Sequence, residues 1–536
     1  MYLTTFMRAS LNVCLFLLCG CIPSETAKIL LSGGFGDGSH FLSLVPLGKT
    51  LASRGHDVKY MVADAYLEPA AKLANSSLIN FEVFHLPGLK EQVDDSHARL
   101  CDIAFADSKL SEMMRLLHLL STINHDACEA VMMDEELLTR LSEYDGFVVD
   151  VVWVCGVYVK SYLERHRGTK DVPVVVLAPM TPIPYIFEEA GSPFVPSYQP
   201  VSLLKTMHSS SMSFIERCRN VFAYLSFVFM FDEMVFREPF ADLVSRYDLH
   251  SDLTSTISNH VDLYFINSDF SVEFPFALMP NIIPVGGLTS RPANSLDNDL
   301  EEFMMSSGHH GVIIFSLGSY FAKITSTRPK FINMFIEAFS LLPQKIIFQL
   351  KELPPSELPD NIMALPWLPL NDLLGHPKTR VLLYHGGNNA FYEALYHGVP
   401  LVVVPLGGDQ HDVGVRVLNS GLGTLIDMDR LSPDHIVEQL EEVLSNPAYQ
   451  ATARRLSAIF RDRPMSPADT AAFWVEHVIK HGGDHLRPRT QSMSFFQIYM
   501  IDILCAAISC SILLCCGIRS CFSYSCRLAK IKPKQE

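Results

Sequence analysis

Short apolar runs alternate with amphipathic helical patterns along most of the chain. In the first half, the apolar runs that predict strands are residues 28–31, 58–62, 172–181 and 261–267, and a helical pattern over residues 41–54 follows the first of them. In the second half, the predicted strands are residues 311–315, 345–350, 381–384 and 401–404, with helices over residues 330–342 and 388–397 between them. Uninterrupted apolar runs are typical of parallel strands covered on both faces. The alternation therefore predicts two α/β domains.

A polar, acidic stretch over residues 291–306 separates the two halves. We place the domain boundary there, which gives a first domain over residues 28–290 and a second over residues 291–470. Within the first domain, residues 182–200 are rich in proline and aromatic residues and predict a loop. Residues 218–240 are strongly apolar with a helical period. For these we favour core packing, and contact with a membrane surface or with lipophilic acceptors is the alternative.

The N-terminal residues 1–27 have the pattern of a secretory signal peptide. A basic Arg8 precedes an apolar run over residues 13–21, and small residues follow. This run is too short for a membrane-spanning helix, which needs about 20 apolar residues.

A second apolar segment, residues 495–518, carries one charge, Asp502, and has the length of a membrane-spanning helix. The basic tail over residues 519–536 is expected to stay in the cytosol by the positive-inside rule. A glycosylphosphatidylinositol signal would instead end in apolar residues. We therefore expect a single-pass membrane protein with a lumenal body, in which Asn75 opens a glycosylation sequon.

Composition excludes several classes of protein. The 536 residues carry a formal net charge of −16 without a basic stripe, which argues against nucleic acid as a partner. The glycines at 34, 36 and 38 lack the spacing of a dinucleotide-binding fingerprint, which excludes a nicotinamide dehydrogenase.

Of the 13 cysteines, those of the expected lumenal body are Cys101, Cys128, Cys155 and Cys218. They form no metal-binding or disulfide-scaffold pattern, and we expect buried free thiols.

The stretch over residues 364–412 carries the most specific chemistry. His385-Gly386-Gly387 ends a predicted strand, and Asn388 or Asn389 is expected to cap the following helix. A glycine turn at a helix N-terminus presents backbone N–H groups and the positive end of the helix dipole to an anion. The turn therefore suits a diphosphate, to which His385 is expected to donate a hydrogen bond.

Further polar residues of this stretch suit a sugar nucleotide. Asn389 and Glu393 are four residues apart and share a helix face, and a carboxylate at position 393 can accept hydrogen bonds from two vicinal hydroxyls. Asp409 and Gln410 follow the next strand, where α/β sheets place ligand-binding groups. The pattern predicts a site for an activated sugar that carries a diphosphate.

The order and spacing of these residues resemble the signature of the UDP-glycosyltransferases, which include the UDP-glucuronosyltransferases. The matching positions are Trp367, Pro369, His385, Gly387, Glu393, Asp409 and Gln410. The resemblance implies the GT-B architecture, in which two Rossmann-like domains face each other, and a final segment over residues 471–494 that crosses back over the first domain. It also implies that the first domain binds the acceptor, with the loop over residues 182–200 lining its pocket. The second domain is then expected to bind the UDP-sugar, with the Ser316-Leu317-Gly318-Ser319 turn contacting the nucleotide. Leu370 departs from the family, which usually has glutamine there, whereas Trp367 can still stack on uracil.

The same resemblance implies a catalytic pair. Ser39-His40 matches the Ser-His pair after the first strand of the family, and Asp145 and Asp150 match its Asp-x-x-x-x-Asp pattern at the end of a later strand. An aspartate that holds one imidazole nitrogen leaves the other free to take a proton from an acceptor hydroxyl. We expect His40 to be the base and Asp150 its partner.

The donor sugar depends on position 267. Vertebrate glucuronosyltransferases have an arginine there that is credited with meeting the glucuronate carboxylate, and this chain has Asn267. A buried carboxylate without a cationic partner is costly, so we expect a neutral sugar, glucose first. No metal is expected, because the helix N-terminus and its donors take the place of a cation.

The expected function is inverting transfer of a hexose to a small lipophilic acceptor. Expectations on membrane residence and assembly follow from the end of the chain. Lys532 and Lys534 resemble the dilysine retrieval signal of endoplasmic-reticulum membrane proteins, and a generic basic anchor to acidic lipids is the alternative. A homo- or hetero-oligomer is possible. The competing function is that of a catalytically inactive, membrane-bound lipophile binder or partner subunit of an active relative.

Overall fold

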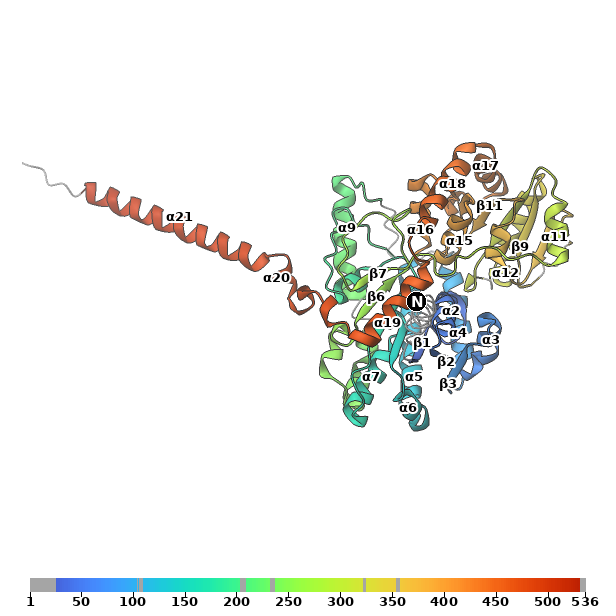
Figure 1. The fold of residues 1–536 in the computed structure, drawn as a ribbon. Coiled ribbons are helices and arrows are strands. Elements are labelled where there is room, and N and C mark those ends of the chain that lie inside the picture. Colours follow the sequence, from blue (N-terminus) through green and yellow to red (C-terminus); the bar gives the residue numbers. More distant parts are fainter. Residues whose placement is uncertain are drawn as a thin grey trace, which may run out of the picture.

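The computed structural model describes residues 26–103, 105, 109–202, 209–231, 237–321, 324–352 and 357–530. The predicted signal peptide, apart from its last two residues, and the two lysines of the predicted retrieval signal lie outside the described residues. Figure 1 shows two α/β lobes and one long helix that leaves them.

The first lobe is built on a seven-stranded sheet in which every neighbouring pair is parallel. The strand order is β3-β2-β1-β4-β5-β6-β7. Strands β4 and β5 are buried along their whole length, as the uninterrupted apolar runs predict. The strands are β1 (Lys28–Ser32), β2 (Asp57–Ala63), β3 (Asn80–Phe84), β4 (Gly146–Asp150), β5 (Val174–Ala178), β6 (Leu263–Ile266) and β7 (Ile282–Pro284).

Helices cover both faces of this sheet. On one face α2 packs with the crossover helix α19, and on the other α5 and α7 pack around Trp153. The α-helices are α2 (Gly38–Ser53), α3 (Leu67–Ala74), α4 (Leu89–Ile103), α5 (Lys109–Met133), α6 (Glu135–Leu141), α7 (Cys155–Arg167), α8 (Pro184–Glu189), α9 (Phe214–Ser226) and α10 (Ala241–Arg246).

The second lobe repeats this plan with a six-stranded parallel sheet in the order β10-β9-β8-β11-β12-β13. Its strands are β8 (Val312–Ser316), β9 (Lys345–Gln349), β10 (Ile362–Leu365), β11 (Thr379–Tyr384), β12 (Leu401–Val403) and β13 (Gly423–Leu425). Its helices are α11 (Asn298–Met305), α12 (Ile324–Thr327), α13 (Pro329–Ser340), α14 (Leu370–Leu374), α15 (Asn388–His397), α16 (Gln410–Ser420), α17 (Pro433–Ser445) and α18 (Pro447–Arg461). The predicted domain boundary falls between β7 and β8.

The crossover helix α19 (Pro467–His481) returns to the first lobe (Figure 1). Ser466 caps its N-terminus, and Pro467 occupies the first turn, where no backbone N–H is needed. Its apolar face is buried in the core of the first domain, and Glu476 contacts Arg54 at 2.9 Å. The end of the chain is therefore fastened to the first domain, not to the second.

The membrane segment begins later than predicted. Residues Phe495–Ile498 form a separate short helix, α20, and α21 covers Ile501–Lys530. Between them, Met500 has a φ of 53°, and the Tyr499 hydroxyl donates a hydrogen bond of 3.1 Å to the Phe194 carbonyl oxygen of the first domain. Within the described residues, α21 is the one helix long and apolar enough to cross a membrane. Apolar composition alone does not reveal where the chain turns away from the body.

The expectation of buried free thiols is wrong for two of the four cysteines. Cys128 near the end of α5 and Cys155 at the start of α7 form a disulfide, with Cα atoms 5.4 Å apart. These residues are 27 positions apart, and only the packing of α5 against α7 brings them together. Cys101 is a buried free thiol, whereas Cys218 is free but exposed.

Core packing is also wrong for much of the apolar segment over residues 218–240. The outward face of α9 and of the π-helical segment Phe227–Phe231 that follows it exposes large apolar side chains, among them Phe222 and Phe229. Four strands were missed as well, because β3, β7, β10 and β13 lie outside the apolar runs that predict strands.

Candidate active site between the two domains

In both sheets the strand order reverses at an equivalent place, and the predicted site residues lie there. In the first sheet β1 and β4 are neighbours, and in the second β8 and β11 are neighbours. Ligands of open α/β sheets bind outside the carboxyl ends of the strands at such a switch point. His40 follows β1 and Asp150 ends β4, while Ser316 ends β8 and His385 follows β11. One topological rule thus places four predicted residues.

His40 and Asp150 form a direct contact. The Nδ1 atom of His40 lies 2.8 Å from the Oδ2 atom of Asp150, whose other oxygen accepts the Val152 backbone N–H at 2.8 Å. The Asp150 side chain is 1% exposed, whereas that of His40 is 20% exposed. The pair is therefore fixed from its buried side, and the Nε2 atom of His40 carries no contact to the carboxylate.

Charges from both domains act on His40. Burial disfavours the imidazolium, but nearby carboxylates, Asp150 foremost, together outweigh this effect and raise the pKa of His40 above its ordinary value. Asp409 of the second domain and Asp37 act in the same direction. Burial raises the pKa of Asp37 itself to about 6. His40 is thus held in the electrostatic field of the opposite domain, as a residue of the cleft must be.

Tyr320 is a cleft residue that sequence reasoning missed. It follows the Ser316–Ser319 turn, and its ring centroid lies 6.3 Å from that of His40 and 4.8 Å from that of His97. A Cβ atom on Gly38 would lie 2.5 Å from the Tyr320 ring, so only glycine lets α2 approach this ring. The position of Tyr320 directly after the predicted turn was the signal that could have identified it.

His385 is enclosed by two glycines. A Cβ on Gly318 would lie 2.4 Å from the imidazole, and one on Gly387 would lie 2.5 Å from Nε2. Burial lowers the pKa of His385 to about 4, so the ring is neutral at physiological pH. Its Nδ1 lies 3.4 Å from the Ser316 carbonyl oxygen. Because that oxygen can only accept, the proton sits on Nδ1, and Nε2 has none to donate.

The Ser316–Ser319 turn is held by a residue that the sequence did not reveal. The Oε1 atom of Gln349, at the end of β9, accepts hydrogen bonds from the Ser316 hydroxyl at 2.9 Å and from the Leu317 and Gly318 N–H groups, both at 3.1 Å. Its Nε2 donates to the Gly318 carbonyl oxygen at 3.2 Å. This buried amide fixes the backbone of the turn, in which Gly318 has a φ of 68°.

The predicted asparagine cap of α15 is wrong. Gly387 occupies the N-cap position, and no side chain caps the helix. The asparagines bind the first domain instead. Asn388 donates to the Asn267 carbonyl oxygen at 3.0 Å, and Asn389 donates to the Ser39 carbonyl oxygen at 3.2 Å and to the Ser43 hydroxyl at 3.0 Å. Local sequence could not show this, because the partners lie on the other domain.

The next two predicted residues, Glu393 and Trp367, lie farther along the second domain. Burial raises the pKa of Glu393 to about 7, although the Thr289 hydroxyl and the Arg291 guanidinium oppose the shift. Trp367 lies in the loop before α14 and is 48% exposed. An aromatic face that is open to solvent is available for stacking on a base.

Asp409 and Gln410 use part of their hydrogen-bonding capacity within the protein. The Oδ2 atom of Asp409 accepts the Thr181 backbone N–H of the first domain at 2.9 Å. The Oε1 atom of Gln410 accepts the Leu406 and Gly407 N–H groups at 2.7 and 3.0 Å. Gln410 thus shapes its own turn, while Asp409 also joins the two domains.

Asn267 lies at the same junction and is 1% exposed. Its Nδ2 donates to the Pro179 carbonyl oxygen at 2.9 Å and to Asn389 Oδ1 at 3.3 Å, and its Oδ1 accepts the Gly287 N–H at 3.0 Å. All of these partners are uncharged.

Beside the cleft, Glu273 and Arg416 form a buried ion pair of 2.7 Å between the domains.

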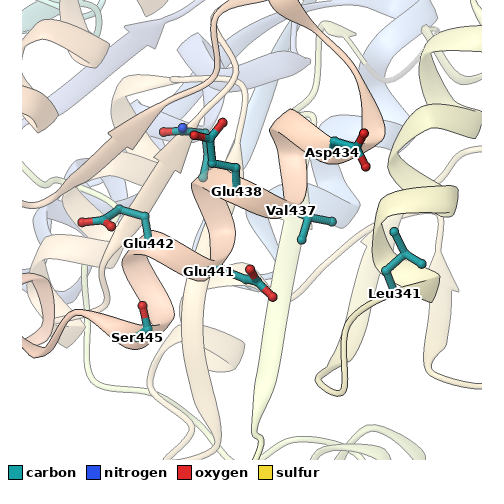
Figure 2. A pocket seen from close by; sticks show the side chains of 8 residues that line it. Leu341, Asp434, Val437, Glu438, Glu441, Glu442 and Ser445 are labelled. Atoms are coloured by element: carbon teal, nitrogen blue, oxygen red, sulfur yellow. The ribbon is translucent and has the colours of Figure 1, made fainter.

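A separate hollow lies on the outer surface of the second domain. Figure 2 shows that side chains of α17 line it together with Leu341, and that most of its polar groups are carboxylates, from Asp434, Glu438, Glu441 and Glu442. An anionic nucleotide would be repelled there. Among the described residues, no group of three or more His, Cys, Asp or Glu side chains is arranged to hold a metal ion.

The family model described as UDP-glucoronosyl and UDP-glucosyl transferase matches residues 28–535. The chain belongs to the UDP-glycosyltransferase family. The rat protein UDP-glucuronosyltransferase 2B1 is 32% identical over 514 residues, which cover 93% of each chain. The mouse protein UDP-glucuronosyltransferase 2B17 is 32% identical over 489 residues and 88% of each chain.

Solved structures show the same fold. The calicheamicin glycosyltransferase CalG4 has a TM-score of 0.55 and 21% identity over 85% of this chain and 99% of its own. The glycosyltransferase SnogD from Streptomyces nogalater has a TM-score of 0.54 and 18% identity over 84% of this chain and 99% of its own. The two parallel-sheet domains therefore form the GT-B architecture, and this UDP-glycosyltransferase is an enzyme that uses a UDP-sugar. Its C-terminal apolar helix marks it as a membrane protein.

Proposed function

We propose that this enzyme transfers a hexose, glucose in preference to glucuronic acid, from a UDP-sugar to a hydroxyl of a small lipophilic acceptor, with inversion at the anomeric carbon. The observation that carries the proposal is the 2.8 Å contact between His40 and Asp150 at the junction of the domains. The acceptor oxygen attacks the anomeric carbon from one face while the bond to UDP breaks on the other. His40 Nε2 takes the acceptor proton, and Asp150 stabilises the imidazolium.

Residues of the second domain are proposed to hold the donor. The Ser316–Ser319 turn and the N-terminus of α15 at Gly387 present backbone N–H groups to the diphosphate, where negative charge grows as UDP leaves. His385 joins them once it carries a proton on Nε2. Trp367 stacks on uracil and Glu393 accepts from the ribose hydroxyls. Asn389, Asp409 and Gln410 face the sugar. No metal is needed on this account, so transfer is expected to continue in EDTA.

The preference for a neutral sugar rests on the uncharged surroundings of Asn267. A carboxylate brought there would lose its hydration without gaining a cation. Turnover of UDP-glucose is therefore expected to exceed that of UDP-glucuronic acid with purified protein. Faster turnover of UDP-glucuronic acid would refute the preference and leave the transferase assignment intact.

Substitution of His40 tests the enzyme itself. His40→Ala is expected to abolish transfer from every UDP-sugar to a panel of phenols, with products identified by mass, and to leave UDP binding nearly intact. His85→Ala is the matched control, because His85 also contacts an aspartate, Asp64, but is exposed on the surface. Transfer by His40→Ala at the parent rate would contradict the proposal. If the parent chain bound acceptors but turned over no UDP-sugar, the inactive lipophile binder would be favoured.

Residence in the endoplasmic reticulum with a lumenal body is part of the proposal, and so is assembly into a homo- or hetero-oligomer. The order of the chain supports the orientation, because α21 follows the catalytic body and leads into a basic tail.

A further inference from the structure

The helix α9 has an apolar face that the described part of the body does not cover. Its exposed large side chains recur at the spacing of one helix face and continue into the π-helical segment Phe227–Phe231 that follows. The most exposed are Phe214 (68%), Ile215 (57%), Phe222 (73%) and Phe229 (69%). Single exposed apolar residues are ordinary on a protein surface, but a contiguous stripe marks an interaction site.

This face cannot turn inward. Asn220 on the opposite side of α9 is buried, and its Nδ2 donates to the Pro196 and Gln199 carbonyl oxygens, both at 2.8 Å. Its Oδ1 accepts the Val201 N–H at 2.9 Å. Tyr224, one turn later, stacks on Phe194 with ring centroids 5.2 Å apart. These contacts fix which side of the helix faces outward.

The same contacts place α9 beside the point where the chain enters the membrane. The Phe194 carbonyl oxygen accepts the hydrogen bond from Tyr499, two residues before α21 begins. Phe496, three residues before Tyr499, and Met500, directly after it, are 61% and 62% exposed. Figure 1 shows α9 on the side of the body from which α21 leaves. The two exposed apolar surfaces are thus tied together through one aromatic residue.

We propose that the outward face of α9, together with α20, inserts into the interfacial layer of the lipid bilayer that α21 crosses. A helix of 13 residues is about 20 Å long, too short to span a bilayer but long enough to lie in its plane. Interfacial helices bury an apolar face to a depth of about 5–10 Å and carry basic residues beside it. Arg217 and Arg219 supply these in α9. The surface holds the body against the membrane, where lipophilic acceptors dissolve.

Tryptophan fluorescence of the full chain in lipid nanodiscs tests this arrangement. Phe222→Trp places a probe on the proposed surface, and Leu341→Trp is the matched control, because Leu341 is 63% exposed on the second domain. The parent protein, which has three native tryptophans, supplies the baseline. Retained transferase activity shows that both variants fold.

The added emission of Phe222→Trp is expected to be blue-shifted and quenched at least about twofold more by brominated lipid than that of Leu341→Trp, with bromines near the headgroups more effective than bromines near the chain ends. Equal quenching of the two variants would overturn the proposal. A blue shift at position 222 without quenching would also overturn it, because a protein, for example a second copy of this chain, would then cover the face.

Discussion

Replacement of Asp150 by asparagine isolates the charge that supports His40. The amide has the size of the carboxylate and can still accept the Val152 N–H through its oxygen. The variant loses the negative charge 2.8 Å from Nδ1 of His40, and its NH2 group, which then faces Nδ1, favours the tautomer that carries the proton on Nε2. The prediction therefore concerns charge and tautomer, with little change in packing.

The size of the effect follows from the distance. Two unit charges whose centres are about 4 Å apart attract by about 4 kcal/mol at an effective dielectric constant of about 20. This attraction is gained when His40 becomes an imidazolium in the transition state. Its loss corresponds to a decrease of about 10³-fold in kcat, which lies within the range of about 10²–10⁴ that general bases contribute.

The pH profile supplies a second and independent measurement. His40 must be unprotonated to act as a base, and its pKa lies above the ordinary value because Asp150 and the neighbouring carboxylates together outweigh burial. The activity of the parent should therefore fall as the pH drops through this raised pKa. In Asp150→Asn burial is no longer balanced by that carboxylate, so the acid limb should move to lower pH.

Asp145→Asn is the matched control, since Asp145 lies just before the other end of β4 and accepts the Lys28 backbone N–H instead. Its kcat should stay within about threefold of the parent. The double variant of His40→Ala and Asp150→Asn should be no slower than His40→Ala alone, because the two residues act as one unit. If Asp150→Asn kept the parental kcat and the same acid limb, the assigned role would be refuted.

Three further outcomes are expected. His385 is neutral with its proton on Nδ1, so UDP binding should be coupled to uptake of a proton on His385 and should tighten as the pH falls. Calorimetry in buffers of different ionisation enthalpy measures this uptake. Binding without proton uptake would show that the prediction is wrong. Gln349→Leu should raise the KM for the UDP-sugar by about tenfold and leave the KM for the acceptor unchanged. The reason is that the Ser316–Ser319 turn loses hydrogen bonds worth about 1 kcal/mol each. Equal changes in both KM values would point to a general loss of structure. Arg416→Met should lower the free energy of unfolding by about 3–5 kcal/mol, because the buried carboxylate of Glu273 loses its partner. Adding Glu273→Leu should restore part of this loss and not all of it, because the Asp412 carboxylate, which also acts on Arg416, stays in place. Denaturant unfolding would show no restoration if the pair itself were stabilising.

The sequence predicted the parts of the fold that depend on local pattern. The strands that carry His40, Asp150, Ser316 and His385 are long apolar runs, and their ends coincide with turn signals. Strands such as β7, β12 and β13 have only three residues, and β3 alternates polar and apolar residues in a helical context. Their pairing is decided by the neighbouring strands, so β3, β7, β10 and β13 were not found.

Contacts between distant segments account for the remaining differences. Asn389 was expected to cap its own helix, but its partners Ser39 and Ser43 lie about 350 positions earlier on the other domain. Gln349 gave no signal, because a glutamine at a strand end is unremarkable until a turn from another strand is placed against it. The disulfide between Cys128 and Cys155 likewise depends on two helices that meet only in the folded core.

The polar groups that make no hydrogen bond within the protein determine how the donor sugar can be held. One oxygen of Asp409 accepts the Thr181 backbone N–H. Because a carboxylate has about four acceptor sites, Asp409 can also accept hydrogen bonds from sugar hydroxyls without breaking this contact with the first domain. The oxygen of Gln410 is occupied by two backbone groups, so any bond from Gln410 to the sugar must be donated by its NH2 group. Asn267 has both ends of its amide engaged. A preference for a neutral sugar would therefore come from the absence of a cation at position 267, and not from a hydrogen bond that Asn267 itself makes to the donor.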